Sequence, residues 1–287
     1  MGAGTTIVER ATPPEGFFPS SRRMARTYLE FARVGFVNAM AYRLRYYTGV
    51  VTYFIYVSVY YFIWKAIYEQ SANIAGFDFG HLITYVAVGW IIRSFYFNNI
   101  DQEIAYQVME GRLAMDLIKP VNIQMMYVAR AAGESVFRLV LLTPPTALLL
   151  ALVYPVRGPA SALHLAGFVV SVGFSFLIVA GINFAVGTFA IRLKSILGLL
   201  RAKFFLLELF SGLLIPMSFF PQMFQKIFAA MPFQYISYIP VLIYLGKING
   251  TAILRALALQ LFWVAILLAA GDALWRWSSR KITIQGG

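Results

Sequence analysis

Long apolar segments alternate with short polar ones along most of this chain of 287 residues. A helix that crosses a membrane needs about 20 predominantly apolar residues, and six segments meet that requirement. We therefore predict an all-α polytopic membrane protein with six transmembrane helices. The predicted spans are residues 48–68, 82–100, 136–154, 163–190, 196–219 and 252–275.

Two of these spans carry residues that predict how they pack. The third contains Pro144 and Pro145, which predict a kink because proline lacks the N–H that a helix needs. Neighbouring helices can satisfy the freed carbonyl groups, so the span itself is retained. The fourth places Gly167, Ser171 and Ser175 four residues apart, a spacing typical of close helix packing.

The segment before the first span has two parts. Residues 1–20 are polar and contain three prolines, and we expect a flexible cytoplasmic tail there. Residues 21–46 place apolar side chains at helical spacing among arginines, a pattern typical of an amphipathic helix in the inner membrane interface. A solvated cytoplasmic helix is the alternative, but this segment continues directly into the first span. The rest, residues 47–281, is the predicted transmembrane domain.

The connection between the second and third spans, residues 101–120, is longer than a tight turn. It holds four of the 12 acidic residues, a glycine at Gly111 and a proline at Pro120. These predict a helix, a break at Gly111, a second short helix and a stop at Pro120. The extra length predicts a docking surface for a cytoplasmic partner.

The segment between the fifth and sixth spans, residues 220–247, is strongly apolar. Pro221, Pro232 and Pro240 divide it into pieces too short to cross a membrane. Non-spanning backbone at membrane depth must be covered by protein or line a cavity. We therefore predict two short re-entrant helices that enter from the outer side and return.

The composition agrees with a membrane protein. Hydrophobic residues make up 60% and charged residues 13% of the chain, and the mean hydropathy is +0.71. Soluble domains carry about 25% charged residues, so a soluble globular enzyme and a disordered chain are both excluded. The absence of cysteine excludes a disulfide scaffold.

The basic excess of the chain reports its topology. Lys and Arg number 24 against 12 Asp and Glu, for a net charge of +12. Most of them lie on one side of the predicted spans. Cytoplasmic loops collect Lys and Arg, so both termini are predicted to be cytoplasmic, and no nucleic-acid partner is expected. The basic residues on the opposite side are Lys65, Arg157, Lys226, Lys247 and Arg255.

No motif for nucleotide binding or catalysis occurs in the sequence. The patterns G-x-x-x-x-G-K-[ST] and H-E-x-x-H are absent, as is G-x-S-x-G. The two histidines, His81 and His164, lie at the borders of spans. We therefore expect no catalytic residue, no metal site and no cofactor bound by this chain.

The stretch VMEGRLAMDLIKPVN carries a G-x-L-x-x-x-L-x-x-P pattern at Gly111, Leu113, Leu117 and Pro120. Its place after the second span, with the amphipathic helix before the first span and the broken apolar segment before the sixth, resembles the permease subunits of ABC-2 type ABC transporters. That class comprises exporters with six spans per subunit. The resemblance extends over residues 21–281.

The resemblance implies one half of an ATP-driven exporter in the bacterial cytoplasmic (inner) membrane. Two separate ATPase subunits, which hold the ATP and Mg²⁺, would dock from the cytoplasm. A second permease, identical or paralogous, would pair with this chain, and membrane lipid would surround both. Residues 101–120 would form the coupling region and residues 21–46 the connecting helix. The residues expected to couple to the ATPase are Glu110, Gly111, Arg112, Leu113, Asp116, Leu117 and Pro120.

Ionisable and aromatic residues within the spans are candidates for the substrate path. Arg93 and Glu208 lie at a depth where charge is costly. Arg93 either lines the path or pairs with Glu208, and for Glu208 pairing is favoured, with Arg201 as a second partner. The tyrosines of the first span suit ordinary helix packing, and their faces also attract organic cations. The candidates are Arg93, Tyr53, Tyr56, Tyr60, Tyr96, Asn99 and Glu208.

The favoured function is export of amphipathic or cationic toxic compounds, such as viologen-like drugs. Export of a peptide, a lipid or a glycan would leave the same pattern in the sequence. An ion-coupled secondary transporter would show inverted repeats and charges clustered at the midplane, and no internal repeat is found. An intramembrane enzyme would need a catalytic constellation that the sequence lacks.

Overall fold

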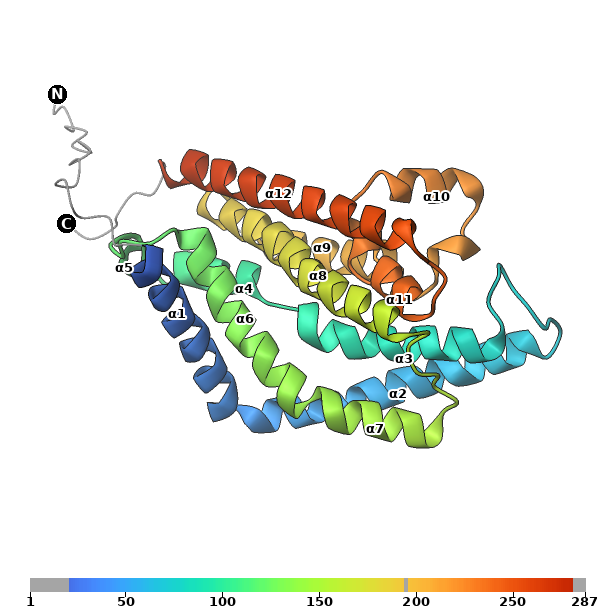
Figure 1. Ribbon diagram of the computed structural model, residues 1–287. Helices are drawn as coiled ribbons and strands as arrows, with labels where there is room; N and C mark the ends of the chain where they lie inside the picture. The colour runs from blue at the N-terminus through green and yellow to red at the C-terminus, as the bar shows by residue number, and fades with distance from the viewer. Residues whose placement is uncertain (1–20, 194–195, 281–287) are drawn as a thin grey trace, which may run out of the picture.

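A computed structural model describes residues 21–193 and 196–280 of the chain, which are helical with short connections. The predicted tail, residues 1–20, lies outside the described residues. Three 3-10 turns, η1 (Phe189–Ile191), η2 (Met217–Phe219) and η3 (Phe233–Tyr235), join the α-helices. The α-helices (Figure 1) are α1 (Ser21–Ala41), α2 (Arg43–Tyr68), α3 (Phe79–Tyr96), α4 (Ile100–Met109), α5 (Leu113–Leu117), α6 (Ile123–Leu141), α7 (Thr143–Val153), α8 (Ala162–Thr188), α9 (Leu197–Phe210), α10 (Gln222–Ala229), α11 (Tyr238–Tyr244) and α12 (Thr251–Ser279).

Three helices are long and apolar enough to cross a membrane, within α2, α8 with η1, and α12. A fourth candidate is the pair α6 and α7, which pass that test together and are bent by 41° at their junction. Pro144 and Pro145 lie at the start of α7, so the predicted kink is confirmed. The third span is longer than predicted, because its helix begins at Ile123.

The structure differs from the prediction at the second and fifth spans. α3 has 18 residues and contains Arg93, and it is not among the candidate spans. The prediction of one helix over 196–219 is wrong, because α9 ends at Phe210 after 14 residues. Gly212 then adopts a φ of +78°, a left-handed conformation in which glycine is favoured. At about 1.5 Å per residue, α9 is about 21 Å long.

The amphipathic segment before the first span forms α1, which ends at Ala41 and is separated from α2 by a single residue, Tyr42. α1 packs closely along α6. A Cβ atom added to Gly133 would lie 1.7 Å from the Ala32 carbonyl oxygen, so this crossing requires glycine. α1 therefore has one face on protein, while its other face remains exposed.

The small residues of α8 lie against α12, as the sequence predicts. The Ser171 hydroxyl donates to Gln260 Oε1 at 2.8 Å, and a Cβ atom on Gly167 would lie 3.0 Å from Ile253. Ser175 donates to the carbonyl oxygen of Tyr235 at 3.1 Å. Hydrogen bonds thus join the two long helices across a closely packed contact.

The apolar segment between α9 and α12 forms two short helices. α11 has a buried core of four residues, and its approach is fixed where the Tyr238 N–H donates to the Ser211 carbonyl oxygen at 3.0 Å. α10, by contrast, exposes Met223 and Phe224. The two helices therefore differ in environment, with α11 packed in the interior and α10 on the surface (Figure 1).

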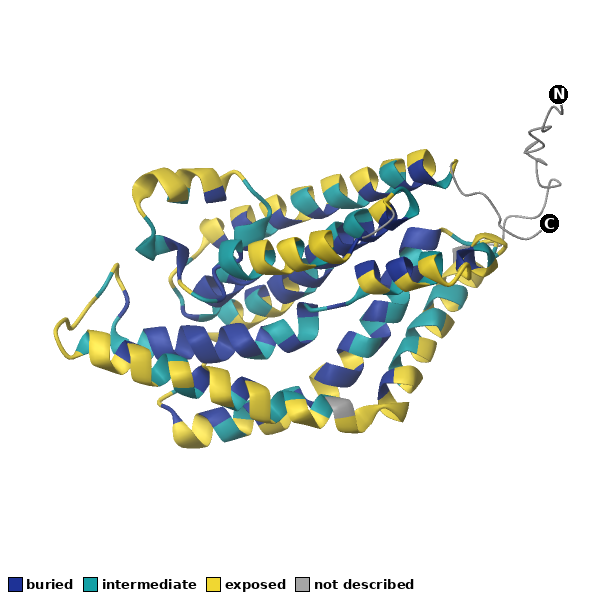
Figure 2. Cartoon of the chain, turned by 180° about the vertical axis from the view of Figure 1, so that it is seen from behind, coloured by how far each residue is buried: buried dark blue, intermediate teal, exposed yellow. Residues whose placement is uncertain are grey.

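The core of the molecule lies between α3, α6, α8 and α11. Twelve of the 18 residues of α3 are buried, and Tyr85, Tyr127, Phe137 and Phe184 are among the largest side chains that are fully buried. Buried residues gather on the inner faces, and exposed residues lie on the outer faces (Figure 2). Many exposed residues are large and apolar, as expected where the surrounding medium is lipid.

Candidate functional site

The connection predicted to dock a partner forms a helical hairpin at one end of the molecule (Figure 1). α4 ends at Met109, and the backbone turns at Gly111, whose φ is +69°. α5 then runs to Leu117, and Pro120 follows before α6 begins. The structure therefore has the predicted order of helix, break, short helix and stop.

The hairpin exposes a surface of mixed character, named here the hairpin tip (residues 109–118). Met109, Met115 and Ile118 are 71%, 65% and 78% exposed. Glu110 and Arg112 form an exposed ion pair beside them, at 3.2 Å. Exposed apolar side chains rimmed by charge are typical of surfaces that contact a protein or a membrane.

Two residues predicted to couple to a partner lie inside the hairpin. Leu113 and Asp116 are each 4% exposed. The Asp116 carboxylate accepts hydrogen bonds from Lys119 Nζ at 2.5 Å and from the Tyr127 hydroxyl at 2.8 Å. Asp116 therefore holds the hairpin on α6. The other predicted coupling residues are exposed, namely Glu110, Gly111, Arg112, Leu117 and Pro120.

A buried polar network joins the start of α4 to α8 and α9. Lys203 Nζ donates to Asp101 Oδ2 at 2.6 Å and to Asn183 Oδ1 at 2.8 Å. Asn183 in turn donates to the carbonyl and side-chain oxygens of Asn98 at 2.8 and 2.9 Å. The side chains of Asp101 and Lys203 are 1% and 11% exposed. The hairpin is thus connected to α9 by one buried ion pair.

A second ion pair joins α9 to α3. Arg93 Nη2 and Nε lie 2.5 and 3.1 Å from Glu208 Oε1. Of the alternatives for Arg93, the pairing with Glu208 is observed, and Arg201 takes no part in it. The guanidinium also lies 4.9–5.6 Å from the centroids of three aromatic rings, those of Trp90, Phe97 and Phe204.

The candidate tyrosines gather near this pair. Tyr56 stacks on Trp90 with centroids 4.4 Å apart, and Tyr53 packs on the same ring at 5.7 Å. Tyr60 lies half-buried one turn further along α2. Tyr96 lines a cavity of about 30 Å³ together with Arg93. A cavity of that volume holds only a water molecule or two, so this region is closed to an organic ligand in the present conformation.

Comparison with models of protein families identifies the family of this chain. A family model described as ABC-2 family transporter protein matches residues 54–286. The chain belongs to the ABC-2 transporter family. It is therefore a membrane subunit of an ABC transporter, a permease, as the resemblance of the hairpin sequence predicts. Neither the curated proteins nor the solved structures yield a match.

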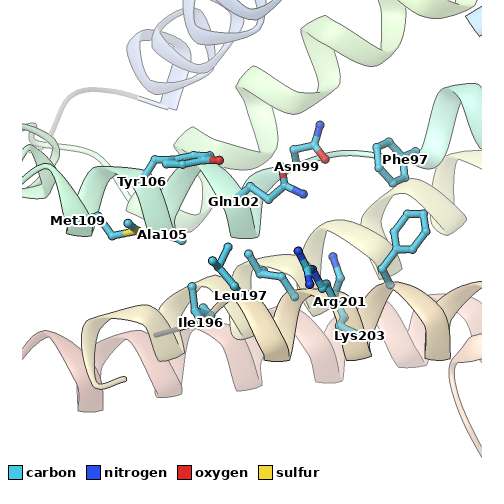
Figure 3. Close-up of a pocket in the computed structure, with 12 residues that line it drawn as sticks. Phe97, Asn99, Gln102, Ala105, Tyr106, Met109, Ile196, Leu197, Arg201 and Lys203 are labelled. Atoms are coloured by element: carbon cyan, nitrogen blue, oxygen red, sulfur yellow. The ribbon is translucent and has the colours of Figure 1, made fainter. Parts of the chain in front are cut away.

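Two clefts flank α4 of this ABC-2 permease. A cleft of about 320 Å³ lies between α4 and α9 (Figure 3), and one of about 500 Å³ lies between α1, α4 and α6. Asn99, a candidate path residue, lines both. In the larger cleft Glu103 pairs with Arg130 at 2.8 Å. Burial raises the pKa of Glu103, and Arg130 opposes that effect.

A polar cluster lies at the opposite end of the permease, where α3 begins. Asp78 accepts from the His81 N–H at 2.8 Å and lies 2.5 Å from His81 Nδ1 and 3.2 Å from Arg157 Nη1. Partial burial opposes ionisation of Asp78, but these donors outweigh it and lower its pKa to about 2. Desolvation lowers the pKa of nearby Lys247, while Asp78 raises it.

Sequence reasoning missed the network around Lys203. Asp101 and Lys203 lie 102 positions apart. The residues next to each of them in the sequence do not indicate that the two side chains pair. The one available signal is a lysine within a largely apolar helix, where a charged side chain needs a partner. Across the described parts of the chain, no group of three or more His, Asp or Glu side chains could hold a metal.

Proposed function

We propose that this chain is the membrane-spanning half of an ATP-driven exporter of amphipathic, and in particular cationic, toxic compounds. The observation that carries the proposal is the hairpin tip, in which Met109, Met115 and Ile118 are exposed at the end of the hairpin. Apolar side chains presented in this way stabilise contact with a folded protein. That protein is an ATPase subunit, which supplies the ATP and Mg²⁺.

The proposed complex contains two ATPase subunits and a second permease, identical or paralogous. α9 has no buried residue among its 14, and only 11% of the apolar window of α2 is buried. Both helices therefore offer surface that a second permease or lipid would cover.

The proposed topology has six spans, with α3 and α9 as the two short ones, and places both termini in the cytoplasm of a bacterium. The described chain starts at α1 and ends after α12, and both ends lie at the end of the molecule that carries α5 (Figure 1). Hydrogen bonds hold other segments at this end of the molecule. The Asn122 N–H, just before α6, donates to the hydroxyl of Tyr28 in α1 at 3.1 Å. Arg192, just after η1, donates to the carbonyl oxygen of Trp277 in α12 at 2.6 Å. In this topology α10 lies on the outer side and α11 is re-entrant.

The chain lacks cysteine, so single-cysteine labelling tests this topology directly. Met115→Cys and Met223→Cys place exposed thiols at opposite ends of the molecule. A membrane-impermeant maleimide should label Met223→Cys in intact cells and Met115→Cys only after the membrane is opened. The reverse pattern would contradict the proposed orientation.

The proposed mechanism transmits force from the hairpin to α9. ATP binding moves the docked ATPase subunits and with them the tip. Asp101 at the start of α4 holds Lys203 at 2.6 Å, so displacement of the hairpin pulls on α9. Because α9 has no buried residue, few packing contacts within this chain oppose its movement. Its movement opens the closed region around Arg93 and Glu208, where the cargo passes.

A cationic cargo suits the aromatic faces of α2 and α3, since Trp90 already binds the Arg93 guanidinium. Tyr56 is 46% exposed beside it and is available to an organic cation. Viologen-stimulated ATP hydrolysis by the purified complex tests this cargo. Stimulation by a peptide, a lipid or a glycan instead would support the exporter function and contradict the proposed cationic cargo.

The docking contact is tested by Met115→Glu with Ile118→Glu. We expect loss of the ATPase subunit from a mild-detergent purification, because two carboxylates would replace the apolar contact. Met223→Glu on α10, also on an exposed side chain, is the matched control and should retain the subunit. Copurification with the tip variant would refute this docking site. If even the unmodified chain never copurifies with an ATPase, the proposed complex with separate ATPase subunits is refuted.

A further inference from the structure

The cleft between α4 and α9 has a volume of about 320 Å³ and opens beside the hairpin. Its walls come from both helices, and Arg201 and Lys203 extend from α9 toward Gln102 and Asn99 (Figure 3). A volume of this size accommodates part of a small organic molecule.

The two cations in this cleft differ in their partners. Lys203 is neutralised by Asp101 at 2.6 Å. Arg201 forms neither an ion pair nor a hydrogen bond with any other residue in the part of the chain that the structure describes. Its guanidinium therefore has its full set of donors available. Arg201 is exposed on α9, and an exposed arginine with free donors beside an apolar cleft can bind an anion from outside the chain.

Most of the other residues that line the cleft are apolar or aromatic. Arginine binds carboxylate and phosphate oxygens with two parallel hydrogen bonds, and Gln102 and Asn99 add donors on the opposite wall. An inorganic anion would leave the rest of the cleft unfilled, whereas an alkyl chain would fill it. The larger of these apolar and aromatic lining residues are Phe97, Tyr106, Met109, Leu197, Leu200 and Phe204.

We propose that the α4–α9 cleft binds an amphipathic anion, with its carboxylate or phosphate head on Arg201 and its apolar chain along Phe204 and Tyr106. Such a ligand comes either from the membrane, as an anionic phospholipid, or from the aqueous phase, as a soluble amphiphile. Binding here does not depend on the proposed export function, because the site is defined by this chain alone. A bound anion would lie directly against the α4 and α9 elements that Asp101 and Lys203 connect.

Two probes distinguish the sources, both applied to the purified full-length chain. Dodecyl phosphate, titrated in a non-ionic detergent, tests a soluble amphiphile, with inorganic phosphate and dodecyltrimethylammonium as comparisons. Native mass spectrometry from nanodiscs of equimolar phosphatidylcholine and phosphatidylglycerol tests a membrane lipid by counting the lipids retained.

The variants are Arg201→Gln, Arg201→Lys and Arg255→Gln. Arg255 is the matched control, since it is exposed on α12 and has no ion pair among the described residues. Loss of the Arg201 charge should weaken binding of dodecyl phosphate, or retention of phosphatidylglycerol, by about tenfold or more. Arg201→Lys should retain part of the affinity, because it keeps the charge and loses the paired hydrogen bonds.

An effect of Arg201→Gln on phosphatidylglycerol alone would identify a lipid site, and an effect on dodecyl phosphate alone a site for soluble amphiphiles. Equal binding of both probes by Arg201→Gln and the unmodified chain would overturn the proposal. Equal binding of dodecyltrimethylammonium and dodecyl phosphate would overturn it as well. Inorganic phosphate binding as tightly as dodecyl phosphate would refute the role of the apolar wall.

Discussion

Replacement of Lys203 by methionine tests the buried connection between the hairpin and α9. The side chains of Lys203 and Asp101 are 11% and 1% exposed, so Lys203→Met leaves a buried carboxylate without its cation. Asp101 Oδ1 already has no partner among the described residues, and Oδ2 accepts from Lys203 Nζ. Removing one partner of a buried ion pair costs about 3–5 kcal/mol. We expect that loss in the free energy of unfolding.

The assay is denaturant unfolding of the purified chain in a mild detergent, followed by tryptophan fluorescence. Combining Lys203→Met with Asp101→Asn removes both charges, and we expect the double variant to recover most of the lost stability. Lys226→Met on exposed α10 is the matched control and should change stability by less than about 0.5 kcal/mol. A double variant whose loss equals the sum of the two single losses would refute the coupling between these residues.

Three further predictions concern other parts of the fold. Gly133→Ala should destabilise the chain by about 1–3 kcal/mol, because the added Cβ meets a carbonyl oxygen of α1, whereas Gly173→Ala in α8 meets nothing within 4 Å and should be neutral or stabilising in the same unfolding assay. Glu208→Gln should cost about 2 kcal/mol, less than a fully buried pair, because the glutamine oxygen still accepts from Arg93; an unchanged midpoint would contradict this. Asp78→Asn should cost about 1 kcal/mol at pH 7 after allowance for the 41% exposure of its side chain. The pKa of Asp78 falls from 3.8 to about 2 on folding, so the stabilisation is complete above about pH 4 and is lost as the pH falls through 2; a difference between Asp78→Asn and the unmodified chain that persists unchanged at pH 2 would argue against it.

The hairpin shows which structural features a local sequence pattern predicts and which it does not. Gly111 and Pro120 predicted where its helices end, because backbone conformation at glycine and proline is a local property. Which side chains face outward was not predictable in the same way. Asp116 belongs to the same charged stretch as Glu110, but its burial depends on Lys119 and Tyr127. Only the packing of α5 against α6 sets that difference.

The ends of the membrane-spanning helices were also predicted in part from local sequence and in part not. Apolar length predicted α2, α8 and α12 well, since a long uncharged run is itself the signal. It failed for the fifth span, where Gly212 and the contact of Tyr238 with the Ser211 carbonyl oxygen end the helix early. Apolar composition continues past that point, so hydropathy alone extends the helix too far.

The sequence by itself determined the class of this protein, its long apolar helices, the kink at Pro144 and the hairpin motif, because each depends on residues adjacent in the chain. Only the tertiary structure decided which charges meet. Arg93 pairs with Glu208 across 115 positions, Lys203 pairs with Asp101 across 102, and Arg201 remains free among the described residues. The physical reason is that an ion pair in a low-dielectric interior depends on distance in space, and distance in space is set by how α3, α4 and α9 pack.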